Sequence, residues 1–582
     1  MAKEIALPRQ PDPVHRRGSW WTARFASIPG VAMLRGYHRS WLTSDLVAGL
    51  VLTTLLVPQG MAYAELAGLP TVSGLYTTVA CLVAYALFGP SRILVLGPDS
   101  AVSPLIFAAI TPLLVAGADP STALALAGML ALLVGAIEIG LGAAKLGFVA
   151  DLLSKEVKLG YMNGLAVVII VGQLPKLFGF STDASGFVDE VGAFFSHLDD
   201  VVWPALATGA SCLLLLFVLP RLTRTLPAIL VVIVGATVAS QLLDLSAHGV
   251  PTVGALPQGL PTPKLPWTNF SDVGPLLVAA IGITLVSLTD TIATSASFAA
   301  RRGESVSADK EMIGVGTANL AAGMFQGFTI SSSASRTAVA DNAKAKTQVT
   351  GLVGAAAVVL LLVFFNSILA ALPQTTLAAV VIVAAVSLTD LRALRRYWRV
   401  RPSAVFVSLT TTVGVVFFGV LEGIVFAIAL SIVLFFRSNW WPHGAVLALR
   451  RDRSWHAVTD VDDARELPGI VVFRWEAPLF FANSGSFRRQ VWALVEEKQA
   501  RWVVLQCEAI TDIDVTAADM LEQLDNDLDG RGVHIAFVEL RARLHRQVGR
   551  YGLFEKALNR EHFYDSLDAA IAAINTTDDD PA

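Results

Sequence analysis

Two short polar stretches interrupt the apolar blocks of this sequence, and both contain residue types that can bind an anion. The first is 97–100 (GPDS), and the second is 331–337 (SSSASRT). Backbone that leaves the helix inside a bilayer is tolerated only where it is buried in protein or lines a cavity. Two such breaks, in corresponding positions of two halves, predict a binding site between broken helices.

Each break is expected to start a half-helix near the middle of the bilayer. The segment 93–96 can run extended to Pro98, which suits the first position of a helix, and the second half-helix starts among the serines. A helix N-terminus carries about half a positive charge and free N–H groups, so two converging N-termini favour an anion.

Arg336 lies in the first turn of the second half-helix and adds a full positive charge. A charged arginine at the bilayer centre costs at least about 2.5–3.5 kcal/mol, so its retention indicates a function or a partner. We predict that Arg336 binds the anion. The alternative is a structural partnership with Asp99 or Asp290, and the two roles are compatible.

The helices that begin the two halves carry further polar side chains. In the first, Pro58-Gln59 interrupts the helix and Tyr63 lies one turn from Gln59, although a simple kink with a satisfied amide also explains the pattern. In the second, four polar residues recur at near-helical spacing: Ser287, Asp290, Thr291 and Thr294. An intramembrane carboxylate can bind a coupling proton or cation, because either one removes the cost of burying its charge. Asp290 is therefore a candidate coupling residue, with a charge partnership with Arg336 as the alternative.

The composition indicates a membrane protein with a soluble part. Of the 582 residues, 54% are hydrophobic and 15% charged, and the mean hydropathy is +0.61, whereas soluble chains carry about 25% charged residues. We expect five segments: a cytoplasmic arm at 1–44, a transmembrane domain at 45–437, a linker at 438–455, a cytoplasmic soluble domain at 456–575 and an acidic tail at 576–582.

The apolar blocks predict about fourteen spans, since a spanning helix needs roughly 20 apolar residues. The last block, 403–436, is long enough for two passes broken at Glu422-Gly423. Lysine and arginine concentrate in alternate loops, such as those around Arg92, Lys158 and Arg302. We expect the protein in the cell membrane, and the positive-inside rule then places these loops and both termini in the cytoplasm.

Several function classes are excluded by what the sequence contains. Cys81, Cys212 and Cys507 imply no disulfide and join no histidine at metal-ligand spacing, so neither a metal nor a cofactor is expected. A net charge of −4 with dispersed basic residues argues against nucleic acid as a partner. The absence of a nucleophile–base pair in the sequence argues against an enzyme.

Several longer motifs resemble one family. They are VPQGMAYAELAGLP, GLYTTVACLVAYALFGPSR, GPDSAVSPL, SLTDTIATSASFA, SSSASRTAVADNAKAKTQ, APLFFANSGSFRRQV and ITDIDVTA. With these the chain resembles the SulP family of anion transporters, the sulfate permeases related to pendrin and prestin. The resemblance implies a membrane all-α fold, a seven-plus-seven inverted repeat with core and gate domains and two half-helix breaks. It also implies a cytoplasmic α/β STAS domain and a homodimer.

The resemblance also assigns roles to individual residues. The family's anion site falls on Gln59, Tyr63, Pro98, Asp99, Ser333, Ala334, Ser335 and Arg336. Its acidic coupling position falls on Asp290, near Thr294. The sequence departs from the family pattern at Thr71-Val72-Ser73, which stands where the family commonly has Pro-x-Tyr. A second difficulty is Asp99, whose carboxylate repels a divalent anion unless it is protonated, cation-bound or paired with Arg336. The second difficulty favours coupling to a cation over plain uniport.

The soluble part alternates strand and helix patterns, as expected for a STAS fold. Strands are predicted at 469–474, 502–506 and 533–537, and helices at 486–498, 516–528 and 566–574. Related antagonist proteins carry a phosphorylated serine after an aspartate, but here Val515 follows Asp514. A phosphoswitch is therefore not expected, and roles in docking, nucleotide sensing, or folding and dimer assembly stay open.

Together these features predict secondary active transport of a small anion, with sulfate first and bicarbonate or a dicarboxylate next. We expect proton- or sodium-coupled symport by an elevator-like movement, within membrane lipid. The alternatives are an uncoupled anion channel or exchanger, and a membrane sensor that reports anion occupancy through its STAS domain.

Overall fold

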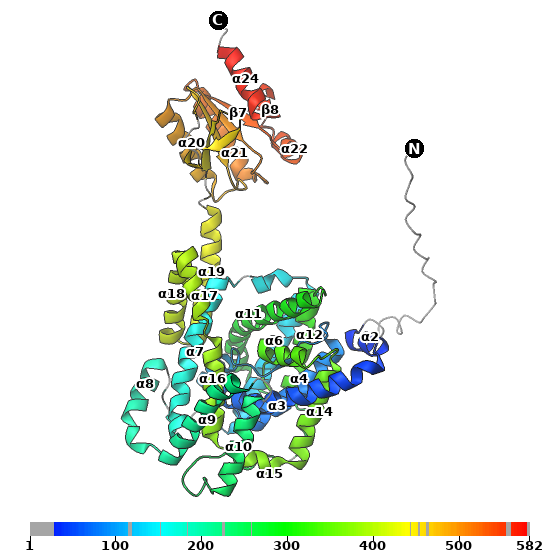
Figure 1. The fold of residues 1–582 in the computed structure, drawn as a ribbon. Helices are drawn as coiled ribbons and strands as arrows, with labels where there is room; N and C mark the ends of the chain where they lie inside the picture. The colour runs from blue at the N-terminus through cyan, green and yellow to red at the C-terminus, as the bar shows by residue number, and fades with distance from the viewer. Residues whose placement is uncertain are drawn as a thin grey trace, which may run out of the picture. The chain divides into compact units, whose positions relative to one another are not determined.

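The computed structural model describes residues 28–578 except for short gaps at 115–118, 152, 183, 185, 224–226, 258, 441, 443, 452–453, 461–464 and 554–559. Most of the predicted N-terminal arm and the end of the predicted acidic tail therefore lie outside the described residues. The chain divides into two compact units, 1–431 and 432–582, which are described separately (Figure 1).

The first unit consists of apolar helices in two successive halves (Figure 1). The first half contains α3 (Leu42–Leu66), α4 (Thr71–Phe88), α5 (Ser103–Ile110), α6 (Pro120–Ala143), α7 (Lys155–Phe178), α9 (Trp203–Leu222) and α10 (Ala228–Leu242). The second contains α11 (Phe270–Arg301), α12 (Ala308–Met324), α13 (Ala334–Asn342), α14 (Val349–Phe364), α16 (Gln374–Leu388), α18 (Pro402–Phe418) and α19 (Val420–Trp440). By length and composition, seven helices among the described residues can cross a membrane. The third helix of each half, α5 and α13, is short.

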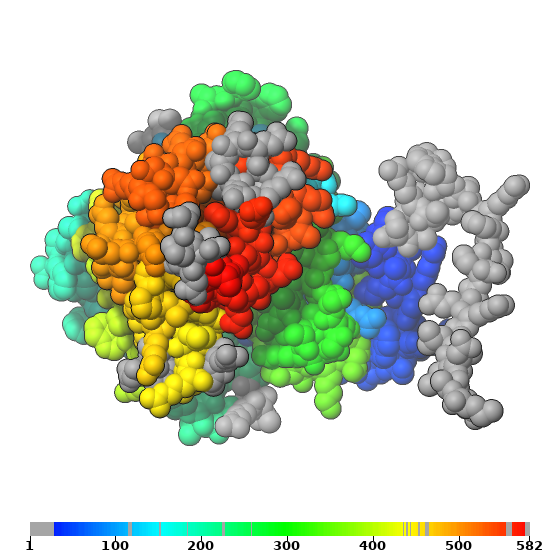
Figure 2. Space-filling view, turned by 90° about the horizontal axis from the view of Figure 1, so that it is seen from above, coloured from blue at the N-terminus to red at the C-terminus, as the bar shows by residue number. Residues whose placement is uncertain are grey.

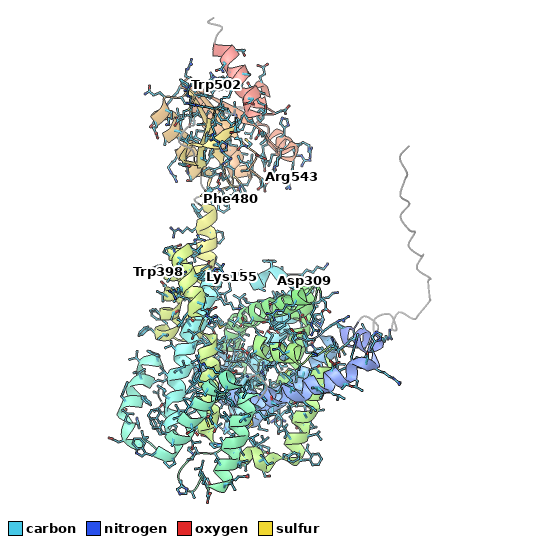
Figure 3. The ribbon with its side chains drawn as sticks, in the orientation of Figure 1. Lys155, Asp309, Trp398, Phe480, Trp502 and Arg543 are labelled. Atoms are coloured by element: carbon cyan, nitrogen blue, oxygen red, sulfur yellow. The ribbon has the colours of Figure 1, made fainter. Side chains whose placement is uncertain are left out.

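Shorter helices connect or flank these elements. They are α2 (Pro29–Arg35), α8 (Phe187–Ser196), α15 (Asn366–Ala370) and α17 (Leu391–Val400). The starts of α7 and α12 and the helix α17 lie at one end of the unit, as the labelled residues Lys155, Asp309 and Trp398 show (Figure 3). The basic loops predicted to share one side of the membrane include these segments.

Two predicted boundaries are wrong. The break between α18 and α19 falls at Gly419 and not at Glu422-Gly423, because Gly419 adopts a φ of +109° that residues with a side chain rarely adopt. Lys158, predicted in a loop, belongs to the first turn of α7, which begins at Lys155.

Glycines let four helices of the first unit pack closely in pairs. A Cβ on Gly74 of α4 would lie 1.8 Å from the carbonyl oxygen of Gly60 on α3. Likewise, a Cβ on Gly135 of α6 would lie 2.7 Å from the carbonyl oxygen of Gly316 on α12. Small residues at such contacts allow backbones to approach in a membrane, where packing takes over from the hydrophobic effect. These contacts join α3 to α4 and α6 to α12, and α12 in turn packs against α4.

The second unit contains a six-stranded sheet in the order β4-β3-β5-β6-β7-β8. The strands are β3 (Gly444–Leu449), β4 (Trp455–Ala457), β5 (Ile470–Trp475), β6 (Trp502–Gln506), β7 (His534–Val538) and β8 (Phe563–Tyr564). The helices are α20 (Ser484–Lys498), α21 (Val515–Asp529), α22 (Ala542–Arg550) and α24 (Leu567–Asp578). Strands β5 to β8 are parallel, whereas β3 and β4 are antiparallel to their neighbours.

Alternate residues of the central strands face two apolar clusters. Phe473 and Leu505 pack with α20 and α21 on one face, while Val504 and Ala536 pack with α24 on the other. Helix α24, red in Figure 2, lies at the surface of this unit. The six elements predicted for the soluble part are confirmed within three residues at each end except for the last, α24, which extends to Asp578. Strand β3 lies within 438–455, the segment predicted as a linker.

Candidate anion-binding site

The two polar breaks meet as a short antiparallel ladder. Strand β1 (Leu96–Gly97) pairs with β2 (Ser331–Ser332), so that Leu96 lies opposite Ser332 and Gly97 opposite Ser331. The Ser333 N–H extends the ladder by donating to the Val95 carbonyl oxygen at 3.1 Å. The backbone that leaves the helix in each half therefore satisfies its hydrogen bonds with the other half.

The half-helix α13 begins where the sequence predicts. Ser333 is its N-cap, and the Ser333 side chain accepts a hydrogen bond from the Arg336 N–H at 3.4 Å. The Ser333 and Ser335 hydroxyl oxygens lie 3.0 Å apart. Ala334 and Ser335 are exposed, so this helix N-terminus is accessible.

The half-helix α5 begins later than predicted. The prediction that Pro98 starts it is wrong, because α5 begins at Ser103. Asp99 organises the intervening turn: its carboxylate accepts the Ala101 N–H at 3.0 Å and its carbonyl oxygen accepts the Ser103 N–H at 3.0 Å. A short acidic side chain of this kind competes for backbone N–H groups and so sets the start of a helix.

Arg336 lies at the junction of the two breaks and is fully buried, with 0% of its surface exposed. Its Nη1 donates to the Pro98 carbonyl oxygen at 2.6 Å. A Cβ on Gly97 would lie 3.2–3.4 Å from the guanidinium atoms, so the group packs directly on this glycine. Its Nε and Nη2 atoms are buried without a hydrogen-bond partner.

The predicted acidic partners do not anchor this arginine. Among the described residues no ion pair joins Arg336 to Asp99 or Asp290, although Asp99 lies close enough to interact with it electrostatically. Buried donors are nearly always satisfied, so two unpartnered nitrogens on a cation favour binding of an acceptor beside them. A guanidinium donates strong, paired hydrogen bonds to oxyanions.

The predicted residues of α3 lie beside this junction. Tyr63 is buried and interacts with Asp99, Ser100 and Arg336. Gln59 lies one turn away, is buried, and has an Oε1 atom without a hydrogen-bond partner. The structure thus gathers Gln59, Tyr63, Pro98, Asp99, Ser333, Ala334, Ser335 and Arg336 around the paired breaks.

The predicted coupling residues lie on α11. Asp290 forms an ion pair with Lys158 of α7, so the alternative that Asp290 pairs with Arg336 is wrong. Thr294, one turn further along α11, is half-buried and makes no side-chain hydrogen bond within the described part of the chain. The Asp290–Lys158 pair joins α11, which packs against β2 and α6, to α7, which packs with α16 and α18.

Sequence reasoning missed a buried carboxylate, Glu138 of α6. Its oxygens accept hydrogen bonds from the Ser287 hydroxyl at 3.1 Å and the Asn319 amide at 2.8 Å. Asn319 in turn accepts the Ile330 N–H at 2.8 Å, directly before β2. Glu138 therefore positions the second break, and its isolation in an apolar block was the available signal.

The cysteines and acidic residues complete the description of the side chains. Cys81, Cys212 and Cys507 are free and buried. Within the described ranges no group of three His, Cys, Asp or Glu residues is placed to hold a metal ion.

Comparison with known proteins identifies the family of this chain. The sulfate permease family matches residues 42–411, and the STAS domain matches residues 463–570. The chain belongs to the sulfate permease family. The resemblance inferred from the sequence motifs is confirmed.

Relatives extend along nearly the whole chain. A protein named "Probable sulfate transporter Rv1739c" from Mycobacterium tuberculosis is 39% identical over 548 residues, which are 94% of this chain and 97% of that protein. "Sulfate transporter 3.1" of Arabidopsis thaliana is 28% identical over 564 residues, covering 92% of this chain and 85% of the relative.

Solved structures show the same fold. A structure of SLC26A9 aligns with a TM-score of 0.87 and 23% identity over 98% of both chains. The transmembrane domain of the cyanobacterial bicarbonate transporter BicA aligns with a TM-score of 0.60 and 22% identity, covering 68% of this chain and 98% of that one. The predicted fold class, a helical membrane unit followed by an α/β STAS domain, is confirmed.

Proposed function

We propose that this chain performs secondary active transport of a small anion, with sulfate as the first candidate and bicarbonate or a dicarboxylate as alternatives. One observation carries the proposal: the fully buried Arg336 guanidinium has two nitrogens without partners where the two breaks meet. The names of the relatives favour sulfate, and the BicA likeness keeps bicarbonate as an alternative.

The groups around Arg336 suit an oxyanion. The accessible N-terminus of α13 offers backbone N–H groups, and Ser335 and Tyr63 offer hydroxyls. Arginine adds a planar set of donors that matches two oxygens of one anion. These donors do not distinguish one small oxyanion from another, so the choice of substrate rests on the relatives.

Coupling to a proton or sodium ion would address the repulsion between Asp99 and a divalent anion. We propose symport in which Asp290 receives the coupling ion. A proton or sodium ion on Asp290 would compete with Lys158 and weaken the ion pair between α11 and α7. Release of that pair would free α11, together with the half-helices α5 and α13, for an elevator-like movement.

Uptake by the purified full chain in proteoliposomes tests the proposal. Labelled sulfate, bicarbonate and dicarboxylates are offered with and without imposed proton and sodium gradients. We expect one anion to accumulate above its outside concentration only when a gradient is present. Flux that never exceeds equilibration would instead establish a channel or exchanger, and binding without flux would establish a sensor.

The proposal also covers the orientation of the protein in the membrane and its oligomeric state. We infer a cell-membrane protein with its basic loops and termini in the cytoplasm, working as a homodimer. Labelling of single cysteines placed at Lys155 and Lys310 of intact cells should fail with an impermeant reagent and succeed after permeabilisation.

A further inference from the structure

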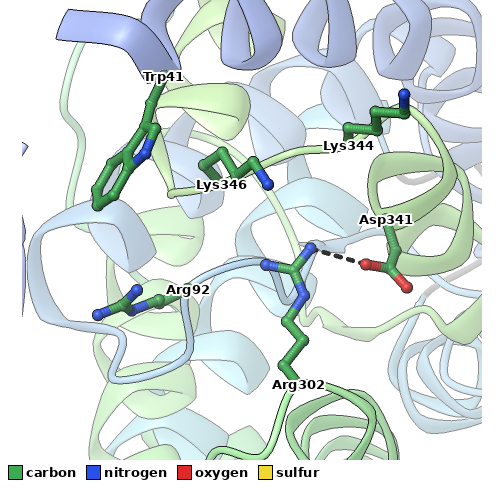
Figure 4. Close-up of a pocket in the computed structure, with 6 residues that line it drawn as sticks. All are labelled: Trp41, Arg92, Arg302, Asp341, Lys344 and Lys346. Carbon is green, nitrogen blue, oxygen red and sulfur yellow. Dashed lines mark hydrogen bonds and ion pairs between the residues drawn. The ribbon is translucent and has the colours of Figure 1, made fainter. Parts of the chain in front are cut away.

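A cavity of about 480 Å³ lies away from the half-helix junction. Its lining residues are Trp41, Arg92, Arg302, Asp341, Lys344 and Lys346, and none belongs to the site around Arg336 (Figure 4). Four cations and one carboxylate give the lining a net charge of three positive units. Such a lining attracts an anion of high charge.

The carboxylate neutralises one cation and positions it. Arg302 Nη2 donates to Asp341 Oδ1 at 2.7 Å (Figure 4). It also donates to the Ala345 carbonyl oxygen at 2.8 Å. Arg92 is paired loosely with Glu304, at 3.7 Å between exposed side chains. Within the described residues, Lys344 and Lys346 form no ion pair.

Buried hydrogen bonds fix the segments that carry these cations. Asp45 has 0% exposure, and its carboxylate accepts the N–H groups of Lys346 at 2.7 Å and of the following residue at 3.2 Å. The buried Gln348 donates to the Ser91 carbonyl oxygen at 2.9 Å, next to Arg92. The backbone that carries the cations is therefore fixed before a ligand arrives, which reduces the entropy cost of binding.

Lys344 occupies a position that normally favours glycine. Its φ is +63°, just after the end of α13, where a left-handed residue closes the helix. Glycine adopts this conformation without steric cost, whereas lysine does not. A lysine at this position is consistent with a role for its positive charge in binding a ligand.

We propose that this cavity binds a phosphate-bearing ligand, either the headgroup of an anionic phospholipid or a free phosphate compound. A single small oxyanion is a poor fit, because one water occupies about 30 Å³ and a 480 Å³ space leaves most of such a site unfilled. The lining also includes Trp41, and tryptophan concentrates at membrane interfaces. Basic pockets beside membrane helices bind anionic headgroups.

The full-length protein in neutral detergent tests the proposal with two probes. Pyrophosphate is titrated calorimetrically, and phosphatidylglycerol retention is measured by native mass spectrometry against phosphatidylcholine. The pocket variant is Lys344→Gln with Lys346→Gln, and the matched control is Lys310→Gln with Arg392→Gln, both exposed and outside the cavity. All proteins carry Arg336→Ala, so that binding at the half-helix junction does not contribute.

We expect the pocket variant to bind at least about tenfold more weakly, as for loss of a charge-assisted hydrogen bond, while the control is unchanged. Loss of pyrophosphate binding alone identifies a free phosphate compound, and loss of phosphatidylglycerol alone identifies a lipid. If the double variant does not fold, Arg92→Gln replaces it as the pocket variant, because Arg92 lies on a separate loop. The proposal is overturned if neither probe binds, or if pocket and control variants behave alike.

Discussion

The replacement Arg336→Ala gives the most informative single perturbation of the anion site. It removes two buried nitrogens, Nε and Nη2, that have no hydrogen-bond partner within the described residues and that we propose bind the anion. Each charge-assisted hydrogen bond contributes about 1.5–3 kcal/mol. Two such contacts correspond to about 10²–10⁴-fold in affinity, at roughly 1.4 kcal/mol per factor of ten.

The variant also leaves the Pro98 carbonyl oxygen without its 2.6 Å partner. Leaving a buried acceptor unpaired costs about 1–3 kcal/mol, so thermal unfolding is measured beside anion affinity. The control is Arg395→Ala, an exposed arginine of α17. Arg336→Lys should recover part of the affinity, because an ammonium lacks the planar fork. Wild-type affinity and flux in a folded Arg336→Ala protein would refute the assignment.

Four further predictions follow from other contacts. Asp290→Asn should permit anion binding yet abolish gradient-driven accumulation in proteoliposomes. If Asp99 is the coupling group, Asp99→Asn and not Asp290→Asn will abolish accumulation, and accumulation by both variants would refute carboxylate coupling. Glu138→Gln should keep transport largely intact, because its amide oxygen can accept from Asn319 while its NH2 donates to the Ser287 hydroxyl. Glu138→Leu should lower both thermal stability and transport by releasing the segment before β2; equal behaviour of the two variants would contradict a positioning role. Truncation after Trp440, before β3, should change yield or rate but leave substrate preference unchanged in competition assays. Burial, followed by the nearby Asp529, raises the pKa of Asp525 to about 7. Relative to Asp525→Asn, the wild-type STAS unit should therefore lose stability in denaturant titrations as pH rises from about 4 through about 7, since the unfolded state gives up the Asp525 proton first.

Polar residues in apolar surroundings made much of the site predictable. A serine cluster and an arginine at membrane depth leave few structural interpretations, and α13 begins among those serines. The regular strand and helix patterns of the STAS unit were likewise readable, since β6 matches its predicted range of 502–506. Local sequence patterns determine such helices and strands, irrespective of the elements that pack against them.

Features that depend on distant partners were not predictable. Strands β1 and β2 have two residues each, too few to show a periodicity, and are defined by pairing across the two halves. The start of α5 was misplaced because the Asp99 side chain, and not Pro98, sets it. The ion pair between Lys158 and Asp290 joins residues on separate helices, and no local pattern indicates it.

The central claim is that the anion binds between the half-helices at Arg336. Crystals of the full chain grown with selenate, a heavier analogue of sulfate, test it through anomalous scattering from selenium. We predict a peak within hydrogen-bonding distance of the Arg336 Nε or Nη2 atom and close to the N-terminus of α13. A protein that binds selenate in solution but shows its peak elsewhere, with none at Arg336, would contradict the account.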